Sequence, residues 1–298
     1  MTSHWAGLSW RGLTAADSDV LRALAMVCHA HDGGSPFVTD PDYLTGWFLK
    51  GAATALFADD LLVAAGAVRE INPTGVDPLT AITGLVHPAW RGRGIGGYVL
   101  NWALNAATSP PRVETEMLTA EQDALFRERG LRQTFGEDVM RAELVPALGW
   151  TPLPAAVRLR EWSTQLAAQF FAVYTAAFAD RPGFPGWSCE QWIEWISDDP
   201  DFATQWTLLA DVEGRDVAFV AGAPDPHRRA GWIVQVGVVP DARNCGLGSA
   251  LVAEVMRRML AAGLQAALLN VNTNNPRAAS VYRRLGFTTI GQRARYER

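Results

Sequence analysis

The chain has 298 residues, of which 49% are hydrophobic and 19% charged, and its formal net charge is −5 at pH 7. This length and hydrophobic content allow two cores of ordinary domain size. The negative charge argues against nucleic acid as a partner, because a nucleic-acid-binding surface needs a basic stripe. The sequence also contains no run of about 18 apolar residues, the length that a membrane-spanning helix requires. We therefore expect small-molecule partners.

Cysteine usage and the N-terminal residues predict a cytoplasmic protein. Cys28, Cys189 and Cys245 are widely spaced, form no CxxC pair and have no histidine cluster nearby. Neither a disulfide framework nor a metal site is expected. Residues 1–10 lack the basic stretch and apolar run of a secretion signal.

The first half of the chain predicts helices and strands in a definite order. Residues 17–30 carry apolar side chains at helical spacing, and three apolar runs with strand character precede a glycine-rich loop. In chain order, we predict helices at 17–30 and 41–49, strands at 53–57, 61–68 and 79–86, the loop, a helix at 94–107, a strand at 112–118, a helix at 121–129 and a final strand.

The second half repeats this order. Residues 146–154 are punctuated by proline and glycine, which indicates a boundary between the halves. In chain order, we predict helices at 165–178 and 190–196, strands at 206–211, 217–222 and 232–239, a second loop, a helix at 246–262, a strand at 266–271, a helix at 277–285 and a strand at 287–293.

The two loops are the most informative feature of the sequence. Arg91-Gly92-Arg93-Gly94-Ile95-Gly96-Gly97 recurs half a chain later as Arg243-Asn244-Cys245-Gly246-Leu247-Gly248-Ser249. Glycines leave backbone N–H groups accessible, and the helix that begins there adds its unpaired amides and positive dipole end. An arginine could add a charge-assisted contact to phosphate. We therefore expect a site for a phosphorylated cofactor in each half.

Three kinds of glycine loop compete for this pattern. A P-loop needs Gly-Lys-Ser/Thr, which neither copy has. A dinucleotide fingerprint is present in the first copy as Gly92, Gly94 and Gly97, with Glu114 and Glu116 about twenty residues later, as that pattern requires. The second copy breaks it, and both loops follow a third predicted strand rather than a first. A nicotinamide or flavin oxidoreductase remains an alternative.

The third kind of loop belongs to an acyltransferase family. Both copies match Arg/Gln-x-x-Gly-x-Gly/Ala, and the second half adds Asn275-x-x-Ala278-x-x-x-Tyr282-x-x-x-Gly286-Phe287. The chain thus resembles the GCN5-related N-acetyltransferase (GNAT) superfamily over nearly its whole length. The resemblance implies an α+β fold with mixed sheets, arranged as two tandem domains at residues 1–147 and 148–298.

The resemblance also implies a cofactor, acetyl-CoA. Its pantetheine arm is expected to pair with the strand before each loop, and its pyrophosphate to bind the loop. The implied cofactor-binding residues are Val236, Val238, Val239, Arg243, Asn244, Gly246, Leu247, Gly248, Ser249 and Asn275 in the second half, and Val86, Arg91, Gly92, Gly94, Gly96 and Gly97 in the first.

Tyr282 is the expected catalytic residue, as the general acid that the family provides for the departing thiolate. Without the motif, Tyr282 would be interpreted as a core aromatic of an amphipathic helix, and Asn275 is also a good helix cap before a proline. Aligning the glycine-aromatic pair of the second half with Gly130-Leu131 places Phe126 opposite Tyr282 and Thr119 opposite Asn275. The first domain is therefore expected to be catalytically degenerate.

The tandem arrangement further resembles a two-domain branch of the superfamily, the mycothiol synthases, which implies acetylation of a cysteinyl amine as an alternative. Residues 176–188 look like their acceptor-side segment, whereas their fourth-strand glutamate falls at Trp232, with Gln235 nearby. The sequence does not identify a general base, and the candidates are Glu190, Glu194, Asp225 and His227.

We predict an acetyl-CoA-dependent N-acetyltransferase that acts on a small-molecule amine, with catalysis in the second domain. The protein is expected to be a monomer or homodimer without metal, nucleic-acid or membrane partners. A CoA-binding sensor that turns over no acceptor is the alternative from another functional class.

Overall fold

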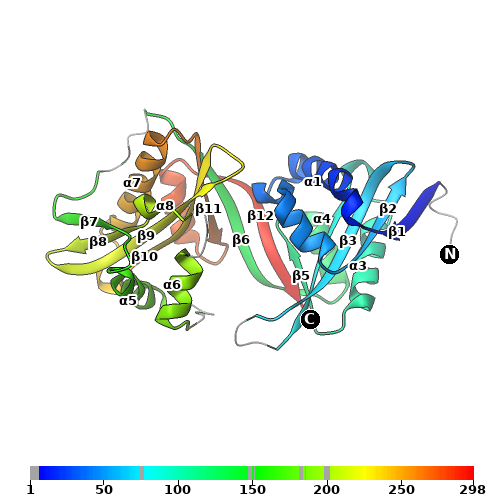
Figure 1. The fold of residues 1–298 in the computed structure, drawn as a ribbon, viewed down its shortest axis with the longest axis horizontal. Helices are drawn as coiled ribbons and strands as arrows, with labels where there is room; N and C mark the ends of the chain where they lie inside the picture. Colours follow the sequence, from blue (N-terminus) through cyan, green and yellow to red (C-terminus); the bar gives the residue numbers. More distant parts are fainter. Residues whose placement is uncertain are drawn as a thin grey trace. The chain divides into compact units, whose positions relative to one another are not determined.

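The computed structural model describes residues 7–73, 77–146, 150, 152–180, 184, 186–197 and 202–298. Its chain divides by contacts into two compact units (Figure 1). Unit 1 comprises Met1–Val139, Asn272–Asn274 and Ile290–Arg298, and unit 2 comprises Met140–Val271 and Asn275–Thr289. The boundary expected between residues 147 and 148 lies outside the described residues. The chain-terminal segment belongs to unit 1, so the units are not consecutive halves.

Unit 1 is built on a mixed sheet with the strand order β1-β2-β3-β4-β5-β12-β6. Antiparallel pairing joins β1 through β4, β4 and β5 are parallel, and β12 pairs antiparallel with β5. The elements are β1 (Leu8–Gly12), α1 (Ser18–Asp32), α2 (Pro41–Leu44), β2 (Ala52–Ala58), β3 (Leu61–Ile71), β4 (Leu79–Val86), α3 (Ile95–Ala106), β5 (Pro111–Thr115), α4 (Ala120–Glu128), β6 (Arg132–Glu143) and β12 (Thr288–Glu297).

Unit 2 repeats the plan with the strand order β6-β11-β10-β9-β8-β7, in which β6 contributes its last residues. Strands β7 to β10 are antiparallel, and β10 and β11 are parallel. The elements are β7 (Val157–Glu161), α5 (Ala167–Phe178), α6 (Cys189–Ser197), β8 (Leu208–Val212), β9 (Arg215–Asp225), β10 (Ala230–Val238), α7 (Leu247–Ala261), β11 (Ala266–Asn272) and α8 (Pro276–Arg284).

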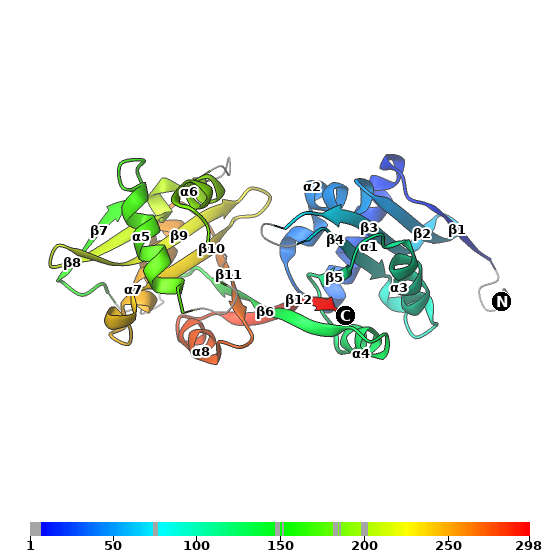
Figure 2. The same ribbon diagram turned by 90° about the horizontal axis from the view of Figure 1, so that it is seen from below.

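Helices flank the strands of each unit, as two perpendicular views show (Figures 1 and 2). Glycines allow helices to pack closely against the strands. A Cβ on Gly66 of β3 would lie 2.4 Å from Val99 of α3. On β10, a Cβ on Gly237 would lie 2.9 Å from Ala177 of α5, whereas one on Gly231 would lie 2.6 Å from Met259 of α7. Helices α5 and α7 therefore cover opposite faces of the sheet of unit 2.

The mixed α+β fold is confirmed, and so is the predicted order of elements after the first strand of each unit. Strands β1 and β7 were missed. Each has only five residues, and the sequence of β7 is Val-Arg-Leu-Arg-Glu. Such short strands with a mostly solvent-exposed face contain too few apolar residues to be predicted from the sequence pattern. Among the described residues, no helix combines the length and apolar character needed to cross a membrane.

The central parallel strands of each unit diverge before they end. Pairing of β4 with β5 runs from Thr80 to Ile82, which lies opposite Val113. Pairing of β10 with β11 runs from Ala230 to Ile233, which lies opposite Leu269, and a bulge in β10 follows directly. The remaining residues of β4 and β10 are thus free of a β5 or β11 partner, and each of these ends leads into a glycine-rich loop.

Candidate active site

The two loops have the same backbone conformation although their sequences differ. Gly94 and Gly246 begin α3 and α7 with φ values of +80° and +82°. Two residues earlier, Gly92 and Asn244 have φ values of +74° and +73°. Asparagine is among the few residues with a side chain that adopt this left-handed region readily. The substitution at Asn244 therefore leaves the loop intact.

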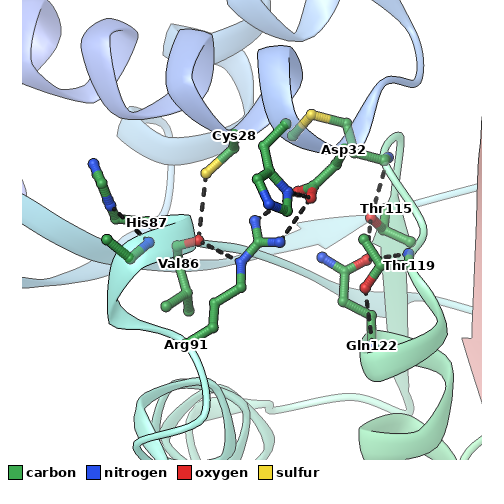
Figure 3. A network of polar contacts seen from close by, with 11 residues as sticks. Cys28, Asp32, Val86, His87, Arg91, Thr115, Thr119 and Gln122 are labelled. Atoms are coloured by element: carbon green, nitrogen blue, oxygen red, sulfur yellow. Dashed lines mark hydrogen bonds and ion pairs between the residues drawn. The ribbon is translucent and has the colours of Figure 1, made fainter.

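The first arginine of the unit 1 loop is bound within the protein (Figure 3). Nε of Arg91 donates to the carbonyl of Val86 at 3.0 Å, and its two terminal nitrogens contact the carboxylate of Asp32 at 2.7 and 2.6 Å. The Asp32 side chain is only 2% exposed. Burial works to raise the pKa of Asp32, but hydrogen bonds from Arg91 and His31 lower it below its ordinary value.

Unit 2 repeats this arrangement. Nε of Arg243 donates to the carbonyl of Val238 at 3.1 Å, and its terminal nitrogens contact Asp180 at 2.8 and 3.2 Å and the carbonyl of Ala177 at 2.9 Å. Both arginines thus tie the loop to the preceding strand and to the helix on the far side of that strand. This geometry favours a positioning role, and direct contact of Arg91 and Arg243 with phosphate stays a prediction.

A cavity of about 250 Å³ occupies the divergence of β4 and β5 in unit 1. The free end of β4 forms one wall, the glycine loop lies at one side, and α4 contributes polar side chains. The lining includes the predicted cofactor residues Val86, Arg91, Gly92, Gly94, Gly96 and Gly97, together with Thr83, Thr115, Thr119, Glu121, Gln122 and Phe126.

Matching caps begin the helix after the fifth strand of each unit. In unit 1, the Thr119 hydroxyl accepts from the N–H of Gln122 at 3.3 Å, and the Gln122 side chain accepts from the N–H of Thr119 at 3.2 Å (Figure 3). In unit 2, the Asn275 side chain accepts from the N–H of Ala278 at 3.1 Å. Asn275 is therefore a helix cap, and its contact with cofactor stays a prediction.

The residues two positions after these caps carry opposite charges in the two units. Arg277 in α8 donates to the side-chain oxygen of Asn244 in the loop. Its counterpart Glu121 in α4 lines the unit 1 cavity. Hydrogen bonds from its own backbone N–H and from Thr119 lower the pKa of Glu121, so the carboxylate is charged at neutral pH. The loop of unit 2 therefore has a cation where that of unit 1 has an anion.

Tyr282 and Phe126 occupy equivalent helix positions with different surroundings. Tyr282 is half-buried against Phe287, with ring centroids 6.0 Å apart, and desolvation raises its pKa to about 12. Among the described residues, none hydrogen bonds to its hydroxyl. Phe126 is 8% exposed and packs edge-on against Tyr296 at 4.9 Å. Only the tyrosine can donate a proton.

Of the four candidate bases, Asp225 already accepts hydrogen bonds from neighbouring residues, and the other three are exposed to solvent. Asp225 is 6% exposed and accepts from the backbone N–H of His227, from Arg228 and from the indole of Trp232 at 3.4 Å. Glu190 and Glu194 are exposed on α6, and the His227 side chain is exposed. The acids of the dinucleotide alternative, Glu114 and Glu116, face Arg295 and Arg293 at 3.6 and 3.5 Å.

Sequence reasoning missed several residues of the two sites. Asp32 is the last residue of α1, and Asp180 lies two residues beyond the end of α5. Aligning the two halves on these helices would have revealed the repeated acid. Asn270 was not singled out, and Gln235 was noted only as a neighbour of Trp232. Both have a buried side-chain oxygen to which no group of the described residues donates a hydrogen bond.

Comparison with known proteins identifies relatives along the whole chain. Residues 164–287 match the model of the acetyltransferase (GNAT) family. A mycothiol acetyltransferase of Frankia alni is 30% identical over 95% of this chain and 92% of its own length, and one of Streptomyces griseus is 34% identical over 69% and 67%.

Solved structures share the tandem fold. A GCN5-related N-acetyltransferase from Sphaerobacter thermophilus matches with a TM-score of 0.75 and 22% identity over 99% of this chain and 96% of its own. A tandem GNAT protein from the clavulanic acid biosynthesis pathway matches with a TM-score of 0.62 and 16% identity over 97% of both chains. At these identities, the likeness establishes the fold.

Proposed function

The chain belongs to the GNAT acetyltransferase family and is an acetyl-CoA-dependent N-acetyltransferase, and on this premise we propose that unit 2 carries out the transfer with Tyr282 as general acid. The observation that carries the proposal is the Tyr282 hydroxyl. It has no hydrogen-bond partner among the described residues, and it lies on the helix whose first turn contacts the loop through Arg277 and Asn244.

The residues of unit 2 fit the cofactor. Among the strands that the structure describes, residues 235–238 of β10 pair with β9 alone, so their other edge can bind the amide groups of a pantetheine arm. The N-terminus of α7 and the left-handed residues Asn244 and Gly246 present backbone N–H groups to a pyrophosphate. Val236, Val238, Val239, Leu247, Gly248 and Ser249 complete the proposed binding surface.

Acetyl-CoA supplies the acyl group as a thioester, whose carbonyl carbon a neutral amine attacks. The C–N bond forms, the C–S bond breaks and the sulfur leaves with the electron pair. Tyr282, whose pKa desolvation raises to about 12, is protonated at neutral pH and can donate its proton to the sulfur. The proton that the amine nitrogen loses passes to water, and the tyrosinate regains a proton from water. Arg243 holds the loop that orients the cofactor.

Unit 1 serves in this proposal as a scaffold that retains a cavity where β4 and β5 diverge. Its Arg91 clamp and the divergence of β4 and β5 match the Arg243 clamp and the divergence of β10 and β11 in unit 2, but Phe126 stands in place of Tyr282, and Glu121 stands in place of Arg277. We therefore expect acyl-CoA to bind unit 1 more weakly than unit 2, without transfer.

The acceptor is a small-molecule amine. A second candidate is the acetylation of a mycothiol-type acceptor, which the names of the relatives state. The 30% identity to one of these relatives over 95% of this chain supports it. Trp232 stands where those enzymes are expected to carry a glutamate, which favours a different amine. We further propose a monomer or homodimer that works in the cytoplasm without nucleic-acid or membrane partners, in line with the net charge of −5.

The test is a matched pair of variants at equivalent helix positions. Tyr282→Phe should lower kcat about 100-fold or more while acetyl-CoA still binds, because removing a general acid costs roughly 10²–10⁴ in rate. Phe126→Leu should leave kcat within about twofold, because unit 1 performs no transfer. Acetyl-CoA binding is measured by calorimetry and transfer by thiol release. Equal activity of Tyr282→Phe and wild type would reject the assignment, and binding without turnover of any amine would favour the sensor.

A further inference from the structure

Gln235 and Asn270 lie on the same face of unit 2, at the point where β10 and β11 part. Gly237 faces α5, and Gln235, two residues earlier in an unbroken register, faces the same way. Gly231 faces α7, so Ile233 and its partner Leu269 also face α7, and Asn270 faces α5. Both amides therefore line the α5 face immediately after the last pair of the two strands.

Each amide leaves a polar atom in an unfavourable position. Oε1 of Gln235 and Oδ1 of Asn270 are buried, and among the described residues neither has a hydrogen-bond partner. A buried acceptor without a donor destabilises a folded protein, so such atoms call for a ligand or an ordered water. Two such oxygens on adjacent strands, beside the open edge of β10, indicate a shared donor from outside the chain.

We propose that Gln235 and Asn270 form the acceptor subsite, and that its ligand is a neutral primary amine. This inference rests on the proposed transfer in unit 2. A primary amine has two N–H donors and one lone pair. When one N–H binds Gln235 and the other binds Asn270, both buried oxygens are satisfied and the lone pair stays free for the thioester carbon.

Neutral amides suit this task better than carboxylates. A carboxylate stabilises the ammonium form, which has three N–H donors and no lone pair, whereas an amide oxygen accepts an N–H without favouring the charged form. As the C–N bond forms, the amine loses one proton to water. Gln235 and Asn270 thus orient the nucleophile and accept no proton.

Unit 1 shows the contrast within the same chain. Glu114 follows Val113 on β5 as Asn270 follows Leu269 on β11, and it faces Arg295 at 3.6 Å. Thr83 follows Ile82 on β4, at the level of Gln235 in β10. Unit 1, which has Phe126 in place of Tyr282, carries an acid that faces an arginine at this position. Unit 2, which has Tyr282, carries two amides whose buried oxygens have no hydrogen-bond partner in the part of the chain that the structure describes.

The first test is acceptor selectivity. Amino-acid amides, amino sugars and aliphatic amines are assayed by thiol release with acetyl-CoA, each beside its N-methyl derivative. Primary amines should be preferred at least tenfold in kcat/KM, because a secondary amine has one N–H and leaves one buried oxygen unsatisfied. Equal turnover of primary and N-methyl amines would overturn the subsite.

The second test uses variants of both amides. Gln235→Leu and Asn270→Leu should each raise the KM of the acceptor about tenfold, as expected for one lost hydrogen bond, with the KM of acetyl-CoA unchanged. Asn270→Asp keeps the shape and should lower both the acceptor KM and kcat, because the new carboxylate holds the ammonium form. Gln169→Leu and Gln169→Glu, on the exposed face of α5, are the controls and should change neither constant.

A water-bridging role predicts different results. In that case, all variants would keep wild-type kinetics and would differ only in melting temperature, which would overturn the proposal. If wild type acetylates no amine, the proposed function fails separately, and the subsite is then judged with CoA alone. Primary amines should raise the melting temperature of the CoA complex, and Gln235→Leu should abolish this shift. No shift in wild type would reject the subsite.

Discussion

The guanidinium of Arg91 and the carboxylate of Asp32 meet through two hydrogen bonds of 2.7 and 2.6 Å, and Arg243 and Asp180 form the same pair in unit 2. In each unit, the arginine that opens the glycine loop is thereby fixed to a helix on the other face of the sheet. Loop geometry therefore depends on an acid outside the loop motif.

Asp180→Asn should weaken acetyl-CoA binding without removing it. The asparagine loses the charge that holds Arg243, while the bonds of Arg243 to Val238 and Ala177 remain, so the loop is loosened rather than lost. We expect the Kd for acetyl-CoA to rise about fivefold, equivalent to about 1 kcal/mol. Calorimetric titration measures it, and Asp241→Asn, in the exposed pair with Arg215, is the control. An unchanged Kd would mean that the clamp is dispensable.

Asp32→Asn should make unit 1 less sensitive to acid. The pKa of Asp32 is lowered overall because the hydrogen bonds from Arg91 and His31 outweigh the effect of burial. A carboxylate with a lowered folded-state pKa stabilises the protein above the unfolded value of about 3.9, and this contribution is lost as the pH falls through the folded value. At neutral pH, the variant should lose about 2 kcal/mol of unfolding free energy.

Urea unfolding of Asp32→Asn and wild type at a series of pH values checks this. The two curves should approach each other below about pH 4, because the carboxylate of the unfolded chain is protonated there while that of the folded protein is protonated only at lower pH. A constant difference down to the lowest pH would show that the effect of Asp32 is not electrostatic.

Gly246→Ala should destabilise unit 2 through its backbone alone. Gly246 has φ +82°, and a Cβ there would meet no atom within 4 Å. The variant has no steric clash and should lose about 1–2 kcal/mol, the cost of a left-handed L-residue. Chemical denaturation measures the loss, and Gly94→Ala, with φ +80° and equally open surroundings, should lose a similar amount in unit 1. A loss above about 4 kcal/mol would point to a contact that this geometry lacks.

Tyr282 should titrate later than a free tyrosine. Desolvation raises its pKa to about 12, so it remains a phenol at pH values where an exposed tyrosine, with a pKa of about 10, is half ionised. Because the folded pKa of this acid is raised, its contribution to stability is present below about pH 10 and declines as the pH rises toward 12.

The absorbance of tyrosinate near 295 nm, compared between wild type and Tyr282→Phe, isolates this group. The difference should appear only above about pH 11. A difference already at pH 10 would show that Tyr282 is solvated, and its role as a donor that stays protonated would need revision.

Much of the fold followed from local patterns in the sequence. Helical spacing of apolar residues located α1, α5 and α7. The repeated glycine loop predicted left-handed backbone at Gly94 and Gly246, which the structure has, because few residue types adopt that conformation. The short strands β1 and β7 were not predicted, because five residues at the start of a unit bury too little apolar surface to give a recognisable hydrophobic pattern.

The sequence by itself determined the family, the cofactor class and the contrast between Tyr282 and Phe126, because these depend on residue type at fixed local spacing. Only the tertiary structure decided that β12 pairs with β5, and that Arg91 and Arg243 are bound by Asp32 and Asp180. It alone decided that Gln235 and Asn270 share a face and that their buried oxygens lack a donor within the described ranges. These relationships join residues far apart in the chain. They arise from strand register and packing, which leave no local periodicity to read.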